Sequence, residues 1–448
     1  MVERRTEDTR TTYNETVEWL FALQRFGSKP GLTNVRHLIG QMGDPHKNFK
    51  AIHITGTNGK GTTTAMITSI LQAADYKVGM FISPHLSSFT ERITINGERI
   101  QPEVVVDIVE GMKSIIDEMV ENPELRHPTF FEVITAVAFK HFSEQEVDFA
   151  ILEVGMGGRL DATNVVQALI SVITNVSLEH TYVLGNSVLE IAEKKAGIIK
   201  KGGVLITATQ DDEVYKLLST VCKKVGSRIF RVGKDLKFNR LTRNLEGQSF
   251  HLEGISRHYN RLFIPLLGKH QLLNAASAVG AVEALNYHGI EIPAKAFHEG
   301  LRNVKWPGRL EVVQENPIVV IDGAKDVEAT RAIKESLLED FQYPRRVAVV
   351  SMSSDKNIPE MIGHLTQAVD SFIITAHSVM GRAAEPETIG NEIEKYSKPY
   401  RIETDVKKAI KGAIDIAGED GMVLIVGSVF LVGEAREIWY KPEASDPV

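Results

Sequence analysis

The segment that most restricts the fold is a glycine-rich turn between an apolar run and a helix-like stretch. Residues 51–62 read AIHITGTNGKGT, and a helical pattern then runs from Thr62 to Asp75. Strand, glycine turn and helix together cradle phosphate, because the turn's backbone N–H groups and the helix N-terminus face the anion. The strict G-x-x-x-x-G-K-[ST] pattern is absent, since Gly61 separates Lys60 from Thr62. We favour a nucleotide triphosphate loop, and a plain strand-to-helix connection is the alternative.

The residue types in this turn suit a phosphate site. Gly56, Gly59 and Gly61 allow close approach of the backbone, because glycine has no Cβ atom to clash. Lys60 is the candidate point charge, and Thr62 is the candidate hydroxyl near Mg²⁺.

Composition limits the class of protein. A chain of 448 residues predicts two or more domains, and 43% hydrophobic residues suffice for a large core. The net charge of −7 argues against nucleic acid and membrane surfaces as partners. Cys222 is the single cysteine, which excludes an intrachain disulfide and indicates a reducing compartment. The N-terminus lacks a signal-peptide pattern and no apolar run could span a membrane, so we expect a soluble, cytoplasmic protein.

Short Val/Ile-rich runs alternate with helical patterns, which predicts an α/β fold with a parallel sheet covered by helices on both faces. The first set of predicted strands is 78–82, 149–154, 171–175 and 204–207. The pattern from Arg228 to Leu267 predicts an antiparallel appendage. A second set of strands, 318–321, 346–351, 372–375 and 423–426, indicates a second domain. Around Trp306-Pro-Gly the pattern breaks, so we predict domains at 1–301 and 302–448.

Several polar residues follow predicted buried strands, where ligands of parallel sheets bind. Glu153, His180 and Ser83 hold such positions and are candidates for metal or ligand contact. Each has an ordinary alternative: a capped turn acid, a satisfied core or surface histidine, and a plain turn serine.

Two lysines and two further strand ends are less distinctive. Lys194 and Lys195 close a predicted helix over Val188–Ala196, where lysines are normally surface charges that complement the helix dipole. From the pattern alone we interpret both as surface residues. Asp322 and Ser428 follow strands of the second domain, and ligand contact and ordinary turn chemistry are equally consistent with them.

Taken together, the motifs resemble the folylpolyglutamate synthase / dihydrofolate synthase family of the Mur-ligase superfamily. The resemblance runs in order over residues 30–436. The matching stretches are GTNGKGT (56–62), SPHL and ERITING (83–97), TFFEVITAVAF (129–139), EVGMGGRLDATN (153–164), EH, LG and IAEKKAGIIK (179–200), GKHQLLNAA (268–276), WPGRLEV (306–312) and GSVFLVGE (427–434).

The resemblance implies an ATP- and Mg²⁺-dependent amide ligase with a P-loop-type central domain and a Rossmann-like C-terminal domain. ATP would phosphorylate a folate carboxylate, and the amine of L-glutamate would displace phosphate from the acyl phosphate. Folate or dihydropteroate and L-glutamate are the implied partners, and a monomer is expected. The site is expected in the cleft between the two domains.

The resemblance also implies roles for individual residues. Two Mg²⁺ sites fall to Ser83 with Glu153 and to His180, and Lys195 matches the lysine that carries CO₂ as a carbamate, against the surface interpretation above. Lys60, Glu153, His180 and Lys195 are the implied catalytic set. The implied ATP-binding residues are Gly56, Thr57, Asn58, Gly59, Lys60, Gly61, Thr62, Asn274, Arg309, Asp322 and Lys325. The positions that border the pterin are Thr129, Phe130, Phe131, Glu132 and Ala162.

The chain departs from the family pattern at several positions. Lys325-Asp326-Val327 replaces the usual His-Asn-Pro, Lys194 replaces a glutamate, and Glu179 replaces an aspartate. The loop Ser28–Leu32 lacks the acidic segment of bifunctional members, so dihydropteroate is the less secure substrate. Two alternatives stay open: a ligase that glutamylates another pterin or carboxylate, and a nucleotide-binding protein that has lost ligase turnover.

Overall fold

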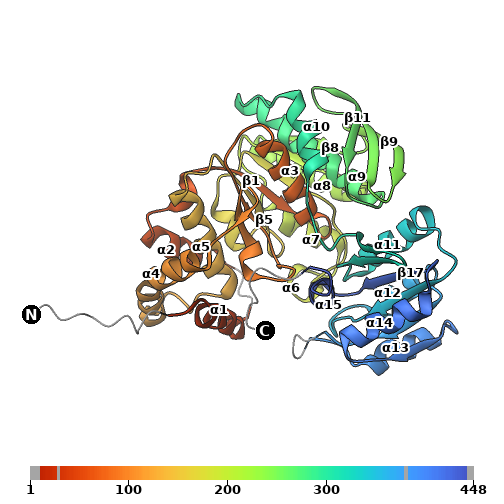
Figure 1. The fold of residues 1–448 in the computed structure, drawn as a ribbon. Helices are drawn as coiled ribbons and strands as arrows, with labels where there is room; N and C mark the ends of the chain where they lie inside the picture. The colour runs from red at the N-terminus through yellow and green to blue at the C-terminus, as the bar shows by residue number, and fades with distance from the viewer. Residues whose placement is uncertain (1–10, 28–30, 378–381, 441–448) are drawn as a thin grey trace, which may run out of the picture.

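The computed structural model of the chain describes residues 11–27, 31–377 and 382–440 (Figure 1). The loop position Ser28, singled out above, lies outside them. Within the described ranges, no helix combines the length and apolar character needed to cross a bilayer. The predicted α/β fold class is confirmed by two separate sheets, each flanked by helices.

An eight-stranded sheet forms the centre of the larger part, with the order β4-β3-β2-β5-β1-β6-β7-β8. The six strands β2, β5, β1, β6, β7 and β8 run parallel to their neighbours in this order. At one edge, β3 pairs antiparallel with β2, and β4 pairs antiparallel with β3. Continuous runs of Val, Ile and Phe explain the parallel arrangement, because such strands are covered on both faces. The bounds are β1 Lys50–Thr55, β2 Val78–Phe81, β3 Ile93–Ile95, β4 Glu98–Arg99, β5 Phe149–Glu153, β6 Ile170–Ile173, β7 Val204–Thr207 and β8 Arg228–Arg231.

Helices cover both faces of this sheet, as predicted. One face, which includes Ile52 and Ile54 of β1, packs against α3 (Lys60–Gln72), α9 (His270–Glu283) and α10 (Ala294–Asn303). The other face carries two groups of helices (Figure 1). They are α1 Tyr13–Ala22, α2 Thr33–Gln41, α4 Pro102–Glu121 and α5 Phe130–Glu144, and then α7 Val188–Ala196 and α8 Asp212–Val225.

The antiparallel appendage is smaller than the sequence pattern indicated. Its three strands have the order β11-β10-β9, and their bounds are β9 Lys237–Asn244, β10 Gly247–Glu253 and β11 His258–Ile264. The prediction that the appendage starts at Arg228 was wrong, because β8 pairs parallel with β7 at the edge of the large sheet. An edge strand has a partner on one side only, so its half-buried pattern resembles that of an antiparallel strand.

The C-terminal part is a six-stranded sheet with the order β12-β13-β17-β14-β15-β16. The four predicted strands of this part are present, and the edge strands β12 and β16 were not predicted. One face packs against α11, α12 and α13, and the other against α14 and α15. The strands are β12 Glu311–Glu315, β13 Ile318–Asp322, β14 Arg346–Val350, β15 Ser371–Ile374, β16 Tyr400–Ile402 and β17 Met422–Val426. The helices are α11 Val327–Asp340, α12 Ile358–Leu365, α13 Pro386–Glu394, α14 Val406–Ala417 and α15 Val429–Arg436.

Helix α11 contacts the larger part of the molecule at both of its ends. At the N-cap, Asp326 Oδ1 accepts a hydrogen bond of 3.0 Å from Asn58 Nδ2 in the glycine turn. At the C-terminus, Asp340 pairs with Arg240 at 2.6 Å and with Arg243 at 3.0 Å, both from β9. The division at residues 301/302, which falls in the last turn of α10, stays a prediction.

Candidate active site

The glycine turn connects β1 to α3, and its geometry suits a bound anion. Helix α3 begins at Lys60, so its first amides lack partners within the helix and point out of its N-terminus. That end of a helix attracts negative charge. Lys60 Nζ lies over the turn, where it donates to the carbonyl oxygens of Gly56 at 3.1 Å and Thr57 at 2.9 Å.

A neighbouring strand end holds the turn in place. Asn175, which follows β6, accepts from Thr57 N through its carbonyl oxygen at 3.0 Å and from Asn58 N through Oδ1 at 2.7 Å. These two amides are therefore engaged within the protein, and the amides that remain for phosphate belong to the start of α3. Thr62, with 3% of its surface exposed, lies in the first turn of that helix.

Glycine is required at two positions of the turn by close approach as well as by conformation. Gly59 has φ +81°, and a Cβ atom there would lie 2.2 Å from Oδ1 of Asn274 on α9. A Cβ atom at Gly56 would lie 1.8 Å from Oγ1 of Thr174. The structure thereby brings Asn274, a predicted ATP contact, directly against the turn.

Glu153 ends β5 beside the turn, and it is buried. Its Oε2 accepts from the backbone N–H of Ser83 at 3.2 Å, so these two predicted metal-site residues lie together. Burial raises the pKa of Glu153, and the charges of Lys60, Arg309 and Lys325 oppose that rise. A buried carboxylate surrounded by cations can hold a metal ion that bridges to a phosphate.

His180 lies after β6 as the N-cap of the short helix α6 (Thr181–Leu184) and has a left-handed backbone, with φ 50°. Its Nε2 is 3.5 Å from Glu179 Oε1, and its Nδ1 is buried without a hydrogen-bond partner among the described residues. Burial lowers the pKa of His180, and Glu179 opposes that change. Burial would raise the pKa of Glu179, but Lys60 and Lys325 outweigh it, so that pKa is lowered. Glu179 is therefore an acceptor among cations.

Lys195 is buried, which makes the sequence-based interpretation of it as a surface charge wrong. It lies on the inner face of α7 with 3% of its surface exposed, and its Nζ donates to Gly56 O at 2.7 Å. Burial and the nearby Lys60 lower its pKa to about 7. Lys194 is exposed, so the surface interpretation is confirmed for that residue. The helix end was predicted correctly, but which lysine faces inward depends on how α7 packs.

The C-terminal domain contributes the opposite wall. Asp322 ends β13 and accepts from Leu310 N at 2.8 Å and Ala324 N at 2.7 Å. Arg309 lies against Gly323, and it opposes the rise in the pKa of Asp322 that burial causes. Lys325 points toward the turn, where burial lowers its pKa and Glu179 opposes this.

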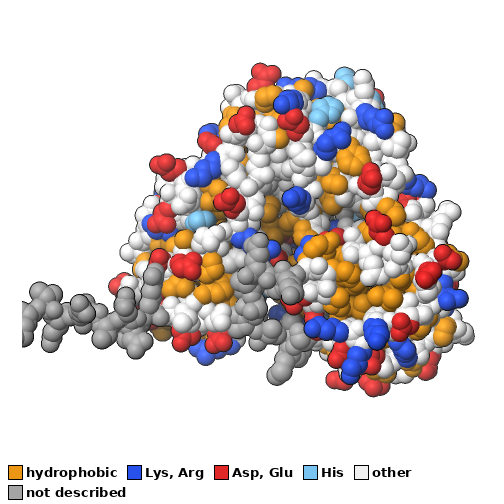
Figure 2. All heavy atoms as spheres, viewed as in Figure 1, with side chains coloured by type: hydrophobic (Ala, Val, Ile, Leu, Met, Phe, Trp, Pro, Cys, Tyr) orange, Lys and Arg blue, Asp and Glu red, His pale blue; other side chains and the backbone are white. Residues whose placement is uncertain are grey.

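Part of this set lines a small cavity of about 80 Å³, whereas Glu153, Asn274, Arg309 and Asp322 lie outside its lining. Three lysines and one histidine face it, against one carboxylate, so the walls favour an anion. Figure 2 shows the surface hollowed where the larger part and the C-terminal domain meet, with Lys and Arg side chains beside the hollow. The lining residues are Thr55, Gly56, Lys60, Ser83, Pro84, Val154, Gly155, Met156, Gly157, Glu179, His180, Leu184, Lys195 and Lys325.

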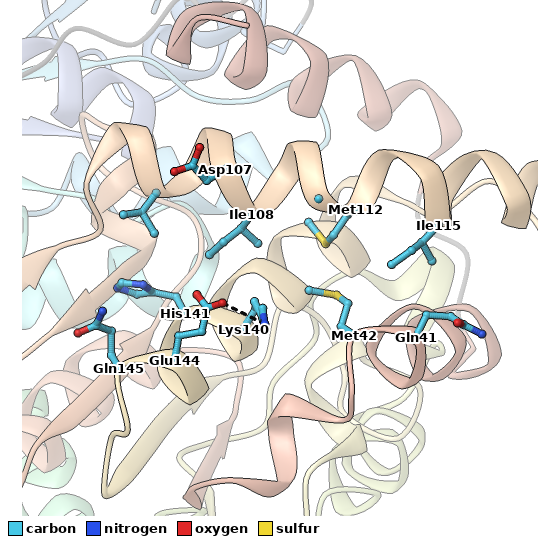
Figure 3. A pocket seen from close by; sticks show the side chains of 12 residues that line it. Gln41, Met42, Asp107, Ile108, Met112, Ile115, Lys140, His141, Glu144 and Gln145 are labelled. Atoms are coloured by element: carbon cyan, nitrogen blue, oxygen red, sulfur yellow. Dashed lines mark ion pairs between the residues drawn. The ribbon is translucent and has the colours of Figure 1, made fainter. Parts of the chain in front are cut away.

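A larger cavity of about 630 Å³ lies elsewhere, between α4, the end of α2 and the end of α5 (Figure 3). Ile108, Met112 and Met42 converge on it, and an ion pair between Lys140 and Glu144 lies on its polar side. None of the residues predicted from the sequence to bind nucleotide, metal or folate lines this space. We therefore place the candidate site at the smaller cavity between the domains.

The predicted folate-contacting residues lie on α5 and the segment after β5, next to this site. Thr129 is the N-cap of α5, and it forms a reciprocal capping box with Glu132, so both are engaged in starting the helix. Phe130 stacks on Phe21, with ring centroids 5.6 Å apart. Phe131 packs against Gly155, and Ala162 is buried in a short 3₁₀ helix.

The donor set fits a metal that also binds substrate. Glu153 and Ser83 offer oxygen atoms, and His180 has a free Nδ1 in the described part of the chain. The described residues contain no cluster of three or more His, Cys, Asp or Glu side chains arranged for a metal. Mg²⁺ commonly takes one or two carboxylates and completes its shell with phosphate oxygens and water, which matches this sparse set.

Comparison with known proteins agrees with this geometry. The family model described as Mur ligase middle domain matches residues 54–282, and that described as Mur ligase, glutamate ligase domain matches residues 308–429. Dihydrofolate synthase/folylpolyglutamate synthase of Bacillus subtilis is 35% identical over 95% of this chain and 99% of that protein. The chain belongs to the folylpolyglutamate synthase / dihydrofolate synthase family. The prediction from the sequence motifs is thereby confirmed.

Solved structures of this family share the fold. Mycobacterium tuberculosis folylpolyglutamate synthase, in complexes with ADP and AMPPCP, superposes with a TM-score of 0.87 at 30% identity, over 95% of this chain and 99% of that one. E. coli FolC in complex with DHPP and ADP has a TM-score of 0.85 at 29% identity, over 96% of this chain and 98% of that one. Relatives in this family have been solved with ADP and AMPPCP bound, which supports ATP as the nucleotide of this chain.

Sequence reasoning missed some residues of the site. Asn175 holds two amides of the turn, and Thr174 Oγ1 donates to Asn58 O at 2.6 Å. Their position after a buried strand was the available signal. Trp306 lies against Gly61, where a Cβ atom would be 2.5 Å from Cζ2, and the sequence motifs that contain it had indicated no role for it in the site.

Proposed function

We propose that this protein is an ATP-dependent amide ligase that adds L-glutamate to tetrahydrofolate and its polyglutamates, with dihydropteroate as a second acceptor. The proposal is supported above all by the lysine-rich cavity at the glycine turn, in a chain whose family is shown over its full length. ATP phosphorylates the acceptor's carboxylate. The amine of glutamate then attacks the acyl phosphate, phosphate leaves, and the amine loses a proton.

Each part of the site has a role in this chemistry. The turn Gly56–Thr62 binds the phosphates through the amides at the start of α3, since those of Thr57 and Asn58 are bonded to Asn175, and Lys60 neutralises charge that develops on the transferring phosphoryl group. Lys60 Nζ, held by two carbonyl oxygens of the turn, would exchange these contacts for phosphate oxygens in this proposal. Asn274, Arg309 and Asp322 border the nucleotide, and Lys325 faces its phosphates.

Bound Mg²⁺ supplies positive charge that draws the nucleotide and carboxylate oxygens together. Ser83 and Glu153 would hold one ion and His180 the other. The buried carboxylate, with cations around it and one oxygen bound only to a backbone amide, supports the first assignment. The unpartnered Nδ1 of His180 supports the second.

Lys195 carries CO₂ as a carbamate in this proposal. Carbamate formation needs the neutral amine, and a pKa of about 7 leaves a large neutral fraction at physiological pH. The carbamate replaces a buried positive charge beside Lys60 with a negative one, so it removes a repulsion and adds oxygen ligands for the metal.

The folate end of the site is formed by Thr129–Glu132 and Ala162. Phe130 and Phe131 offer aromatic surface for a pterin, and the capping box holds the first turn of α5 in place for it. We infer a cytoplasmic protein, as the composition predicts, and a monomer, as the family resemblance implies.

One experiment tests the proposal directly. The purified protein is incubated with ATP, Mg²⁺ and glutamate, and with tetrahydrofolate or dihydropteroate in separate reactions, and the products are weighed by mass spectrometry. A mass increase of one glutamyl residue, with ADP released in equal amount, is the expected result. ADP release without a glutamyl product would indicate another acceptor.

A nucleotide-binding protein without ligase turnover is the second candidate, and Lys325 in place of the family histidine favours it. A lysine that faces phosphate is a stronger electrostatic partner than a neutral imidazole and slows product release. Tight ADP binding with no product from any folate acceptor would identify this case.

A further inference from the structure

Three buried polar residues form a chain beneath the candidate site. His53 lies in the middle of β1, three positions before Gly56 of the glycine turn. Thr163 and Asp161 belong to the segment after β5. His53 and Thr163 have no exposed surface, and Asp161 is 7% exposed. His53 Nε2 is 2.7 Å from Thr163 Oγ1, and Thr163 Oγ1 in turn bonds to Asp161 Oδ1.

The chemistry of the three groups fixes the direction of these bonds. Burial raises the pKa of Asp161, and the bonds from Thr163 and from the amides of Met156 and Thr163 oppose that rise; both carboxyl oxygens accept from backbone amides, so the hydroxyl of Thr163 donates to Asp161. The hydroxyl oxygen then accepts from His53, which puts the imidazole proton on Nε2. Nδ1 is left as a buried lone pair with no partner in the described chain. Burial lowers the pKa of His53 to about 3, so the ring is a neutral donor at any physiological pH.

Asp161 organises the backbone that lines the site. Its Oδ2 accepts from Met156 N at 3.0 Å, and its Oδ1 accepts from Thr163 N at 3.0 Å. These bonds close the segment from Gly155 to Thr163 into a compact loop. Gly155, Met156 and Gly157 line the small cavity.

The same loop is tied to β1 a second time. Thr55 Oγ1 donates to Gly157 O at 2.6 Å, so two alternate residues of the strand, His53 and Thr55, hold the loop from one face. Ala162, assigned to the folate end of the site, lies between Asp161 and Thr163. The strand that leads into the phosphate turn therefore also sets the place of the folate-facing loop.

We infer that His53 is a positioning residue for the folate end of the site, acting through Thr163 and Asp161. The imidazole touches neither nucleotide nor folate. It holds the rotamer of Thr163, which completes the bonds of Asp161 and fixes Ala162 and the loop at its place beside α5. This inference rests on the proposed function, since it concerns the acceptor of that reaction.

Four variants test it. His53→Phe keeps a ring and removes the donor, whereas His53→Gln keeps a donor because its amide nitrogen can take the place of Nε2. Thr163→Val keeps the shape and removes the hydroxyl. Thr375→Val is the matched control: this threonine is also fully buried, and its Oγ1 donates to Thr404 O at 3.2 Å in the C-terminal domain.

Affinity and backbone protection are the two readouts. Titration calorimetry with tetrahydrofolate in the presence of ADP is expected to show about tenfold weaker binding for His53→Phe and Thr163→Val, because a buried hydrogen-bonding group loses its partner. Affinity for ADP alone is expected to stay within about twofold. Amide exchange at Met156 and Thr163 is expected to accelerate in these two variants and not in Thr375→Val. His53→Gln is expected to restore most of the folate affinity.

Two results would overturn the inference. One is unchanged folate affinity despite faster amide exchange, which would make the chain merely structural. The other is an equal loss of folate and ADP affinity that follows the loss of thermal stability in all variants, Thr375→Val included. The binding measurements do not require turnover. A wild-type protein that binds folate without glutamylating it would refute the proposed function. The affinities of the variants would still decide the role of His53.

Discussion

The buried amine of Lys195 predicts that its removal stabilises the protein while it destroys activity. A fall in the pKa of a lysine from 10.5 to about 7 means that folding at neutral pH must strip the amine of its proton or bury its charge. That change corresponds to ~5 kcal/mol. Loss of the hydrogen bond to Gly56 offsets about 1 kcal/mol of the gain. Lys195→Met, which fills similar space, is therefore expected to raise the free energy of unfolding by ~2–4 kcal/mol at pH 7.

The sign of the pH dependence follows from the lowered pKa. Below pH 7 both folded and unfolded states carry the proton, and the destabilisation by Lys195 is at its full size. Between about 7 and 10.5 the unfolded state alone holds the proton, so the wild-type protein gains stability from this group as the pH rises. The advantage of Lys195→Met is thus expected to shrink steadily from pH 7 to pH 10.

Urea unfolding in CO₂-free buffer at pH 7, 8, 9 and 10 measures this, with Lys194→Met on the exposed side of the same helix as the control. Adding bicarbonate at pH 8 is expected to stabilise the wild-type protein and leave Lys195→Met unchanged, since the carbamate needs the amine. Ligation is expected to be lost in Lys195→Met only. A destabilised Lys195→Met protein, or a gain of stability that does not vary with pH, would refute the reasoning.

Four further substitutions probe the same site. Lys60→Ala is expected to abolish ligation without lowering the melting temperature, because it removes charge neutralisation worth several kcal/mol; ADP release from the folded variant at the wild-type rate would contradict the loop assignment. Glu153→Ala and His180→Ala are each expected to slow ligation and to shift its Mg²⁺ dependence to higher concentration, as rates across a Mg²⁺ series would show; identical curves would remove both from the metal site. Lys325→His is expected to weaken ADP binding and to reduce its salt dependence without ending turnover; equal calorimetric affinities at several salt concentrations would make Lys325 an ordinary lysine.

Most strands of the two sheets could be predicted, because strands buried in a parallel sheet consist of continuous runs of apolar, often β-branched residues. Runs such as 149–154 and 423–426 became β5 and β17. The edge was harder: Arg228–Arg231 looks half-buried from the sequence, and its partner β7 can be assigned only in three dimensions.

Site residues could be predicted where a short sequence motif identifies them. They could not be predicted where their role depends on contacts between distant parts of the chain. The glycine turn could be predicted from the spacing of its glycines, and Glu153 from its position at the end of a buried strand. Lys195 and Lys194 have the same local pattern, and only the contact of α7 with the turn at Gly56 distinguishes them. His53 resembles any polar residue in a strand, and its role depends on Thr163, which lies 110 positions away in the chain.

The two attachments of α11 differ in how they respond to the surroundings. The N-cap carboxylate of Asp326 meets a neutral amide in a nearly water-free place, so dissolved ions barely reach it. At the far end, Arg243 and Glu339 are about half exposed, each paired with a largely buried partner, and ions in solution screen the exposed member of such a pair. Rising ionic strength therefore weakens the exposed members of this outer contact, whereas the Arg240–Asp340 pair, with exposed fractions of 14% and 9%, and the Asp326–Asn58 bond are affected less, so salt loosens the rim of the contact and leaves both ends of α11 attached.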